Sequence, residues 1–152
     1  MARYGVFGNA GAASATAATA GLVKVDNPSA STMAAAKIYE FAIGPKANSA
    51  DNTYGIQAKR QSTAGTWTAV TPSPLDAKTG ASVTTAGVAS TAAGTAGVIL
   101  ADWGFHQRGG YRWVSIPGGE LVVPLTFSNG IIIEYDFAQG TDVNGVSMMF
   151  DE

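Results

Sequence analysis

The sequence predicts an all-β protein, an antiparallel two-sheet β-sandwich for which a jelly roll is the leading topology. Apolar and polar residues alternate along many short stretches, which is the period of a strand with one buried face. Turn residues, above all glycine and proline, separate these stretches. The most helix-friendly stretch, Met33–Lys37, is too short to form a stable helix alone. We therefore expect roughly nine or ten short strands and no helix.

The first half of the chain contains two clear strand patterns. In Lys37–Ile43, the side chains of Tyr39, Phe41 and Ile43 share one face of the predicted strand. Tyr54–Gln61 alternates in the same way and predicts a half-buried strand. Shorter strands are expected at Arg3–Phe7, Leu22–Val25 and Trp67–Val70.

The C-terminal third has the glycine punctuation that is typical of a β-meander. We expect Val98–Phe105 to pair with Tyr111–Ile116 across the turn at Gln107–Gly110. Glu120–Phe127 contains a proline, Pro124, and is expected at an edge or a bend.

The strand pattern around Ile131–Phe137 predicts one apolar and one solvent-facing side. One set comprises Ile131, Ile133, Tyr135 and Phe137, and it alternates with Ile132, Glu134 and Asp136. The second set is expected to face solvent, and Val143–Phe150 is expected to close the sheet.

The chain divides into an N-terminal strand with a flexible arm, residues 1–20, and one sandwich domain, residues 21–152. Gly8–Ala20 is rich in alanine, serine, threonine and glycine and has no apolar periodicity. The segment Asp76–Ala96 is similarly poor in large apolar residues and predicts a long surface loop with at most one weak strand.

The composition excludes several classes of protein. The chain of 152 residues has no cysteine, which excludes disulfides and thiolate metal sites. Its net charge of −2 argues against a broad basic face for nucleic acid. No apolar run is long enough to span a membrane, and the N-terminus lacks the pattern of a signal peptide, so we expect a protein that is made in the cytoplasm. Charged residues make up only 13% of the chain, which indicates a surface that a partner covers in part.

No motif for catalysis or metal binding stands out. A triad of Asp102, His106 and Ser115 can be drawn, but no motif surrounds the only histidine. The carboxylates of Glu120, Glu134 and Asp136 could in principle serve a glycosidase. The residues considered for a bound cation are Asp51, Asn52, Asp142 and Asn144, none of them at EF-hand spacing. We therefore expect no enzyme activity, no cofactor and no metal.

Two stretches of the chain resemble a known family. Thr66–Asp76, TWTAVTPSPLD, and Gln107–Pro124, QRGGYRWVSIPGGELVVP, together with the N-terminal RYGVFGNAGA, resemble the jelly-roll head decoration proteins, or cement proteins, of tailed bacteriophages. The resemblance covers most of the chain. It implies a non-enzymatic protein that binds the outside of the expanded phage head and stabilises contacts between major capsid subunits.

The resemblance also implies the partners: the major capsid protein and further copies of the chain, in a trimer. It implies a virion protein on the outer capsid surface, made in the host bacterial cytoplasm, with neither nucleic acid nor membrane as a partner. An alternative is a carbohydrate-binding or adhesin domain of a phage tail or head fibre, because sandwich folds host both functions. The candidate contact residues are Arg3, Tyr4, Phe7, Asn9, Trp67, Pro72, Pro74 and Leu75.

Overall fold

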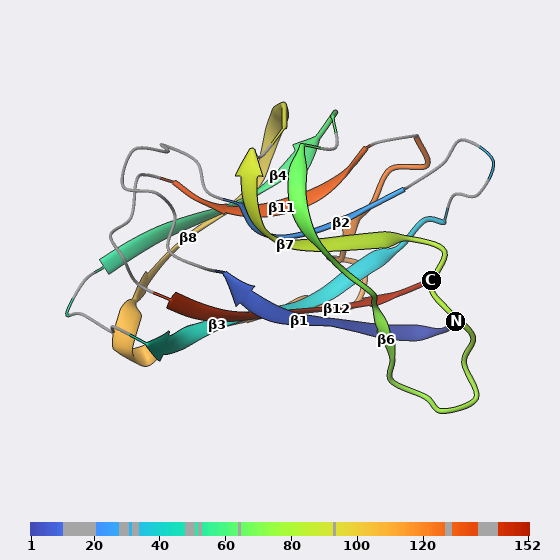
Figure 1. The fold of residues 1–152 in the computed structure, drawn as a ribbon, viewed down its shortest axis with the longest axis horizontal. Coiled ribbons are helices and arrows are strands. Elements are labelled where there is room, and N and C mark those ends of the chain that lie inside the picture. The colour runs from blue at the N-terminus through green and yellow to red at the C-terminus, as the bar shows by residue number, and fades with distance from the viewer. Residues whose placement is uncertain are drawn as a thin grey trace.

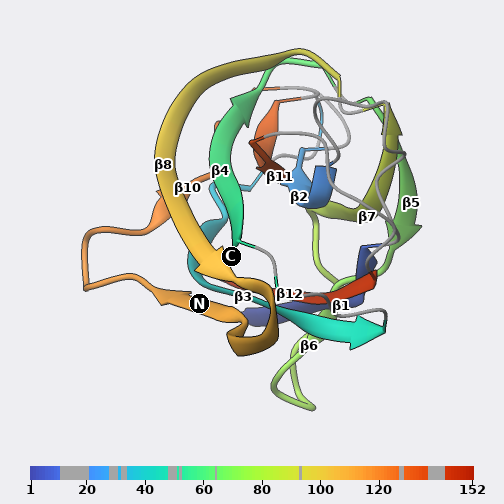
Figure 2. The same cartoon turned by 90° about the vertical axis from the view of Figure 1, so that its left-hand side faces the viewer.

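The structure is a computed structural model that describes residues 1–10, 21–27, 31, 34–47, 51, 53–63, 65–92, 94–126, 129–136 and 143–152. Two six-stranded antiparallel sheets pack face to face, which confirms the predicted β-sandwich. In Figures 1 and 2, one sheet arches over the other. Residues 11–20 of the predicted arm and Phe137 of the predicted apolar face lie outside the described residues.

Sheet A has the strand order β10-β3-β12-β1-β6, and β9 also pairs with β3. Its strands are β1 (Arg3–Ala10), β3 (Lys37–Ala47), β6 (Ser73–Pro74), β9 (Tyr111–Val114), β10 (Leu121–Val122) and β12 (Val143–Asp151). The β1 strand lies between β12 and β6, so the N-terminal strand belongs to the sandwich rather than to an arm outside it.

Sheet B has the strand order β5-β7-β2-β11-β4-β8. Its strands are β2 (Gly21–Asp26), β4 (Thr53–Gln61), β5 (Thr66–Val70), β7 (Thr85–Ala92), β8 (Ala96–His106) and β11 (Gly130–Tyr135). The β7 strand falls within the segment predicted as a long loop with at most one weak strand, and it is eight residues long and pairs with both β5 and β2. The sequence pattern did not reveal this strand because residues such as Ala86 and Gly87 are small. They fit a crowded interior strand, but they produce no alternation of large apolar and polar side chains.

At several steps along the chain, successive strands lie in different sheets. The chain runs from β1 to β2, β3 and β4, and later from β8 to β9, β11 and β12, changing sheet at each of these steps. The resulting four-strand sets, β9-β3-β12-β1 and β2-β11-β4-β8, are consistent with a jelly roll.

The predicted meander is wrong. The β8 strand pairs with β4 in sheet B, whereas β9 pairs with β3 in sheet A. A single 3₁₀ turn, η1 (Gln107–Gly109), followed by Gly110 at a φ of 63°, carries the chain between the sheets. The indole of Trp103 packs against Trp113 at a ring distance of 5.7 Å, so these consecutive strands meet face to face and not edge to edge.

The core lies between the sheets and confirms most of the predicted apolar faces. Phe41, Ile43, Ile56, Ile131 and Ile133 are all buried in it. In β3 the pairing with β12 shifts register between Met149 and Phe150, so Ile38 packs into the core in addition to Phe41 and Ile43. Tyr39, which the plain alternation placed on the core side, is only half-buried.

The outer face of β11 differs from the prediction. Ile132 is fully buried although it lies opposite the core, and the Glu134 side chain is only 1% exposed. The β11 strand is an interior strand, and the Lys59 ammonium of β4 donates to the Glu134 carboxylate at 2.6 Å. On the same face, Lys24 bonds Asp26 at 2.5 Å. Both faces of β11 are therefore buried: the core face by apolar packing, and the outer face beside buried ion pairs.

Candidate protein-binding surface

The pairing of β1 with β6 brings together two segments that the sequence marked separately. Tyr4 lies opposite Pro74 and Gly5 opposite Ser73. The Leu75 N–H then donates to the Arg3 carbonyl at 2.9 Å. Since Pro74 offers no N–H, a sheet edge is where this segment can pair. The predicted contact residues of the N-terminus and of the proline segment therefore meet at one edge of sheet A.

Phe7 and Leu75 form an exposed apolar patch over Gly5, named here the Phe7–Leu75 patch. Their residues are 49% and 45% exposed. A Cβ placed on Gly5 would lie 2.6 Å from the Phe7 ring and 3.3 Å from a Leu75 methyl. The absence of a side chain at Gly5 thus lets both apolar groups lie flat on the strand. Exposed apolar groups that lie side by side on a protein surface can mark a binding site.

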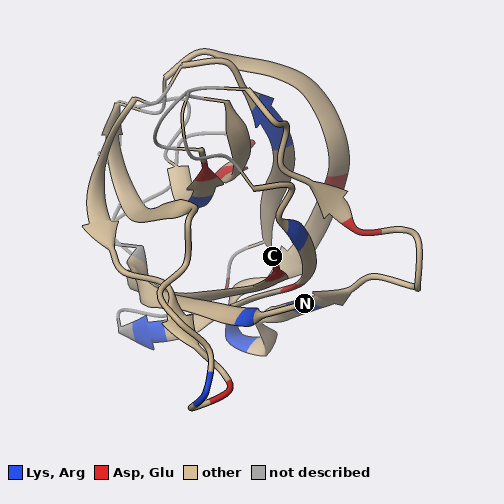
Figure 3. Ribbon diagram, turned by 90° about the vertical axis from the view of Figure 1, so that its right-hand side faces the viewer, with Lys and Arg blue, Asp and Glu red and all other residues tan. Residues whose placement is uncertain are grey.

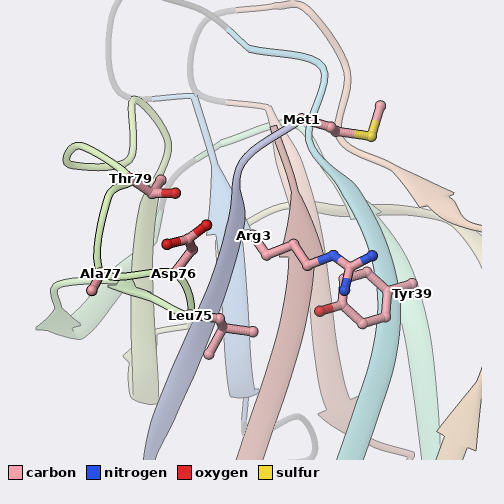
Figure 4. Close-up of a pocket in the computed structure, with 7 residues that line it drawn as sticks. All are labelled: Met1, Arg3, Tyr39, Leu75, Asp76, Ala77 and Thr79. Atoms are coloured by element: carbon pink, nitrogen blue, oxygen red, sulfur yellow. The ribbon is translucent and has the colours of Figure 1, made fainter.

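A groove of about 620 Å³ opens beside this patch (Figure 4). Its lining residues come from the N-terminus, β3 and the loop after β6: Met1, Arg3, Tyr39, Leu75, Asp76, Ala77 and Thr79. Figure 4 shows the Arg3 side chain reaching from β1 toward the Tyr39 ring. The groove therefore offers a guanidinium, a phenol, a carboxylate and apolar groups within one concave site. Arginine and tyrosine are also the residue types that most often dominate protein interfaces.

The charges around the groove are partly paired. The Arg3 Nε lies 3.7 Å from an Asp151 carboxylate oxygen, while the Arg3 side chain stays 70% exposed. Burial raises the pKa of the Tyr39 phenol, Asp151 and Glu40 raise it further, and the positive charge of Arg3 opposes them. Tyr39 is therefore a neutral hydroxyl at physiological pH. Figure 3 shows long stretches of strand without any charged residue, in keeping with the low charge content.

The loop that forms one wall of the groove is held by Glu152, a residue that the sequence did not single out. Its carboxylate accepts hydrogen bonds from the Ser82 hydroxyl at 2.7 Å and from the N–H groups of Val83 and Thr84 at 3.0 and 2.7 Å. The Tyr4 hydroxyl donates to the Gly80 carbonyl at 3.2 Å. Nothing in a local pattern indicates these bonds, because they join residues about 70 positions apart.

The remaining candidate contact residues are distributed as follows. Tyr4 is buried, stacks on Phe150 at a ring distance of 5.5 Å and belongs to the core rather than to the surface. Pro72 is buried as well, whereas Pro74 is exposed beside Leu75. Asn9 is exposed and accepts a hydrogen bond from Lys46 at 2.7 Å.

Trp67 lies apart from this surface, on sheet B. Its ring extends over Gly87 and Gly21, where a Cβ would collide with it. The Lys24 ammonium lies 5.9 Å from the ring centroid. These contacts make Trp67 a half-buried packing residue of the outer face of sheet B.

A second hollow of about 410 Å³ lies on the outer face of sheet A. It is lined by Phe7, Gly8, Ala42, Ile43, Gly44, Lys46, Gly145, Val146 and Ser147. Small residues of β3 and β12, such as Ala42, Gly44 and Gly145, line it together with Phe7. The hollow therefore continues the Phe7–Leu75 patch across the sheet.

The structure does not assemble the catalytic groups considered from the sequence. His106 Nε2 lies 2.9 Å from Asp51, while the Asp102 carboxylate accepts a bond from Gln57. Glu134 is buried against Lys59 in sheet B, and Glu120 bonds the Gly118 N–H in a loop of sheet A.

The described residues contain no group of three or more His, Cys, Asp or Glu side chains that could hold a metal ion. Of the residues considered for a cation, Asn52 and Asp142 lie outside the described residues, and Asn144 donates to the Tyr135 hydroxyl.

No protein-family model, curated protein or solved structure matches the chain. Within the described part of the chain, no helix is long and apolar enough to cross a membrane.

Proposed function

We propose that this protein is a non-enzymatic decoration protein of a tailed-phage head, which binds the outside of the expanded head and stabilises contacts between major capsid subunits. The observation that carries the binding role is the convergence of Arg3, Phe7 and Leu75 at the β1–β6 edge. The assignment of the partner as a capsid protein rests on the resemblance of the two quoted stretches to the cement proteins.

The shape of the molecule suits this role. A rigid sandwich holds the Phe7–Leu75 patch on a sheet, so little ordering of the backbone is needed when a partner binds. Low charge reduces the desolvation cost of covering a large surface. We propose that three copies form a trimer. A trimer would place three such patches on one head site and raise the avidity of binding.

A carbohydrate-binding role has weaker support. Such a role needs an exposed aromatic platform. Trp103, Tyr111 and Trp113 pack against the core, and Trp67 packs on glycines. The described part of the chain thus places these aromatic rings in packing roles.

Binding to heads tests the proposal. Purified protein is mixed with expanded heads that lack it, and the bound fraction is measured after sedimentation. We expect Leu75→Ser to weaken binding by about tenfold or more, as for a central interface residue. Val98→Ser is the matched control, since Val98 is 69% exposed on β8 at the far edge of the other sheet. Equal binding of both variants and the wild type would place the contact elsewhere.

A further inference from the structure

The β1 strand is paired along only part of its second edge. Its first edge pairs with β12 over all residues from Arg3 to Ala10. Its second edge pairs with β6 at Tyr4 and Gly5 alone. Beyond Gly5, the edge that β6 would continue is left without a strand among the described residues.

The direction of the backbone groups follows from two hydrogen bonds. The Ala2 N–H donates to the Glu152 carbonyl on the first edge, and the Arg3 carbonyl accepts from Leu75 on the second edge. Because backbone groups alternate along an antiparallel strand, the groups of Phe7 and Asn9 point to the second edge. No described residue forms a backbone hydrogen bond with them there.

Unpaired edges are templates for another strand, and two other edge strands of this chain carry features that oppose such pairing. The β6 strand is only two residues long and has proline at its second position. The β8 strand has two register shifts against β4, a device that bends an edge away from a flat partner. The stretch Phe7–Asn9 has neither device, and its Phe7 side chain is half exposed.

We propose that an extended segment of the head protein adds to sheet A as a strand beside Phe7–Asn9, in line with β6. Backbone groups of the segment bond the N–H and C=O groups of Phe7 and Asn9, and an apolar side chain of the segment packs on the Phe7–Leu75 patch. Main-chain bonds supply affinity in such strand addition, and side-chain pockets supply specificity. The identity of the donor as the head protein rests on the proposed function.

Hydrogen exchange tests the open edge directly in the full-length protein. In the free protein, we expect the Phe7 and Asn9 amides to exchange much faster than those of Val6 and Gly8, whose N–H groups face β12. On wild-type protein bound to expanded heads, the Phe7 and Asn9 amides become protected. Slow exchange of both amides in the free protein would show that the edge is already paired and would overturn the proposal.

A proline substitution separates the backbone contact from the side chain. Asn9→Pro removes only the outward N–H and places a ring where the added strand must approach, and edge strands accept proline at such positions. Asn9→Ala is the control, because both variants lose the bond from Lys46. We expect Asn9→Pro to bind heads about tenfold more weakly than Asn9→Ala.

The two proposals fail in different ways. If the wild type binds heads and both Asn9 variants bind equally well, strand addition at this edge is wrong while the decoration role stands. If the wild type does not bind heads at all, the decoration role fails and the assignment of the donor strand fails with it.

Discussion

The Glu152 carboxylate lies 2.7 Å from the Thr84 backbone nitrogen and accepts its hydrogen bond. The same side chain bonds Ser82, and the Glu152 backbone pairs in both directions with Ala2. Glu152 therefore joins β1, the chain end and the loop before β7 in one place, beside the groove. Figure 1 shows the two ends of the chain side by side at this point.

The first prediction is a loss of stability in acid that depends on Glu152. Burial alone would raise the pKa of its carboxyl, but the hydrogen bonds from Thr84, Ser82 and Val83 outweigh burial and hold the pKa below the ordinary value of 4.5. A carboxyl whose pKa is lowered by folding adds stability above its unfolded pKa, and this stability is lost as the pH falls through the folded value. Glu152→Gln should thus be less stable than the wild type near neutral pH, and the difference should shrink below about pH 4. Urea unfolding of both proteins at several pH values measures the difference in their free energies of unfolding. A difference that stays constant with pH would contradict the role of the ionised carboxylate.

The second prediction concerns the glycines beneath Trp67. Gly21→Ala should destabilise the protein by about 1–3 kcal/mol, because the new methyl collides with the indole on a packed strand. Gly44→Ala is the matched control, since nothing lies within 4 Å of a Cβ at that position. Thermal unfolding of both variants provides the comparison. Equal melting temperatures would mean that Trp67 does not lie on Gly21.

The third prediction compares a new charge at a buried core site with the same charge at an exposed site. Ile133→Asp should abolish folding, because Ile133 is fully buried in the core and an unpaired carboxylate there costs several kcal/mol. Val98→Asp, at a site that is 69% exposed, should leave stability nearly unchanged. Circular dichroism and solubility distinguish the two. Native-like Ile133→Asp protein would refute the assigned face of β11.

The fourth prediction is that deletion of residues 2–10 unfolds the protein. If the N-terminus were a separate arm, its removal would leave a folded body that no longer binds heads. The structure instead places Tyr4 and Val6 in the core and pairs β1 with β12 along its whole length. A folded, monodisperse deletion variant in gel filtration would show that β1 is dispensable.

Local patterns predicted the strands better than their partners. The alternation in β4 and β11 correctly placed Ile56 and Ile133 in the core, because every second side chain of a strand points to the same face of the sheet. The same alternation could not show that β8 crosses to the other sheet, since glycine marks a turn without specifying whether the chain folds back or crosses over. Nor could it detect the register shift that brings Ile38 into the core.

The candidate surface was predictable in its parts but not as a whole. Phe7 and Leu75 could be marked as candidate contacts from the sequence, but their meeting over Gly5 depends on the pairing of strands about 70 residues apart. Tyr4 and Pro72 were also marked as candidate contacts, but both are buried in the structure. An aromatic and a proline near an edge serve packing as readily as binding, and only the fold distinguishes the two roles.

The most direct test of the central claim is immunogold electron microscopy of phage particles from a host lysate, with antibody against this protein. The decoration role predicts gold spread evenly over the heads. Gold confined to tails or fibres would contradict that role and favour the adhesin alternative, and particles without gold would refute the assignment to the virion.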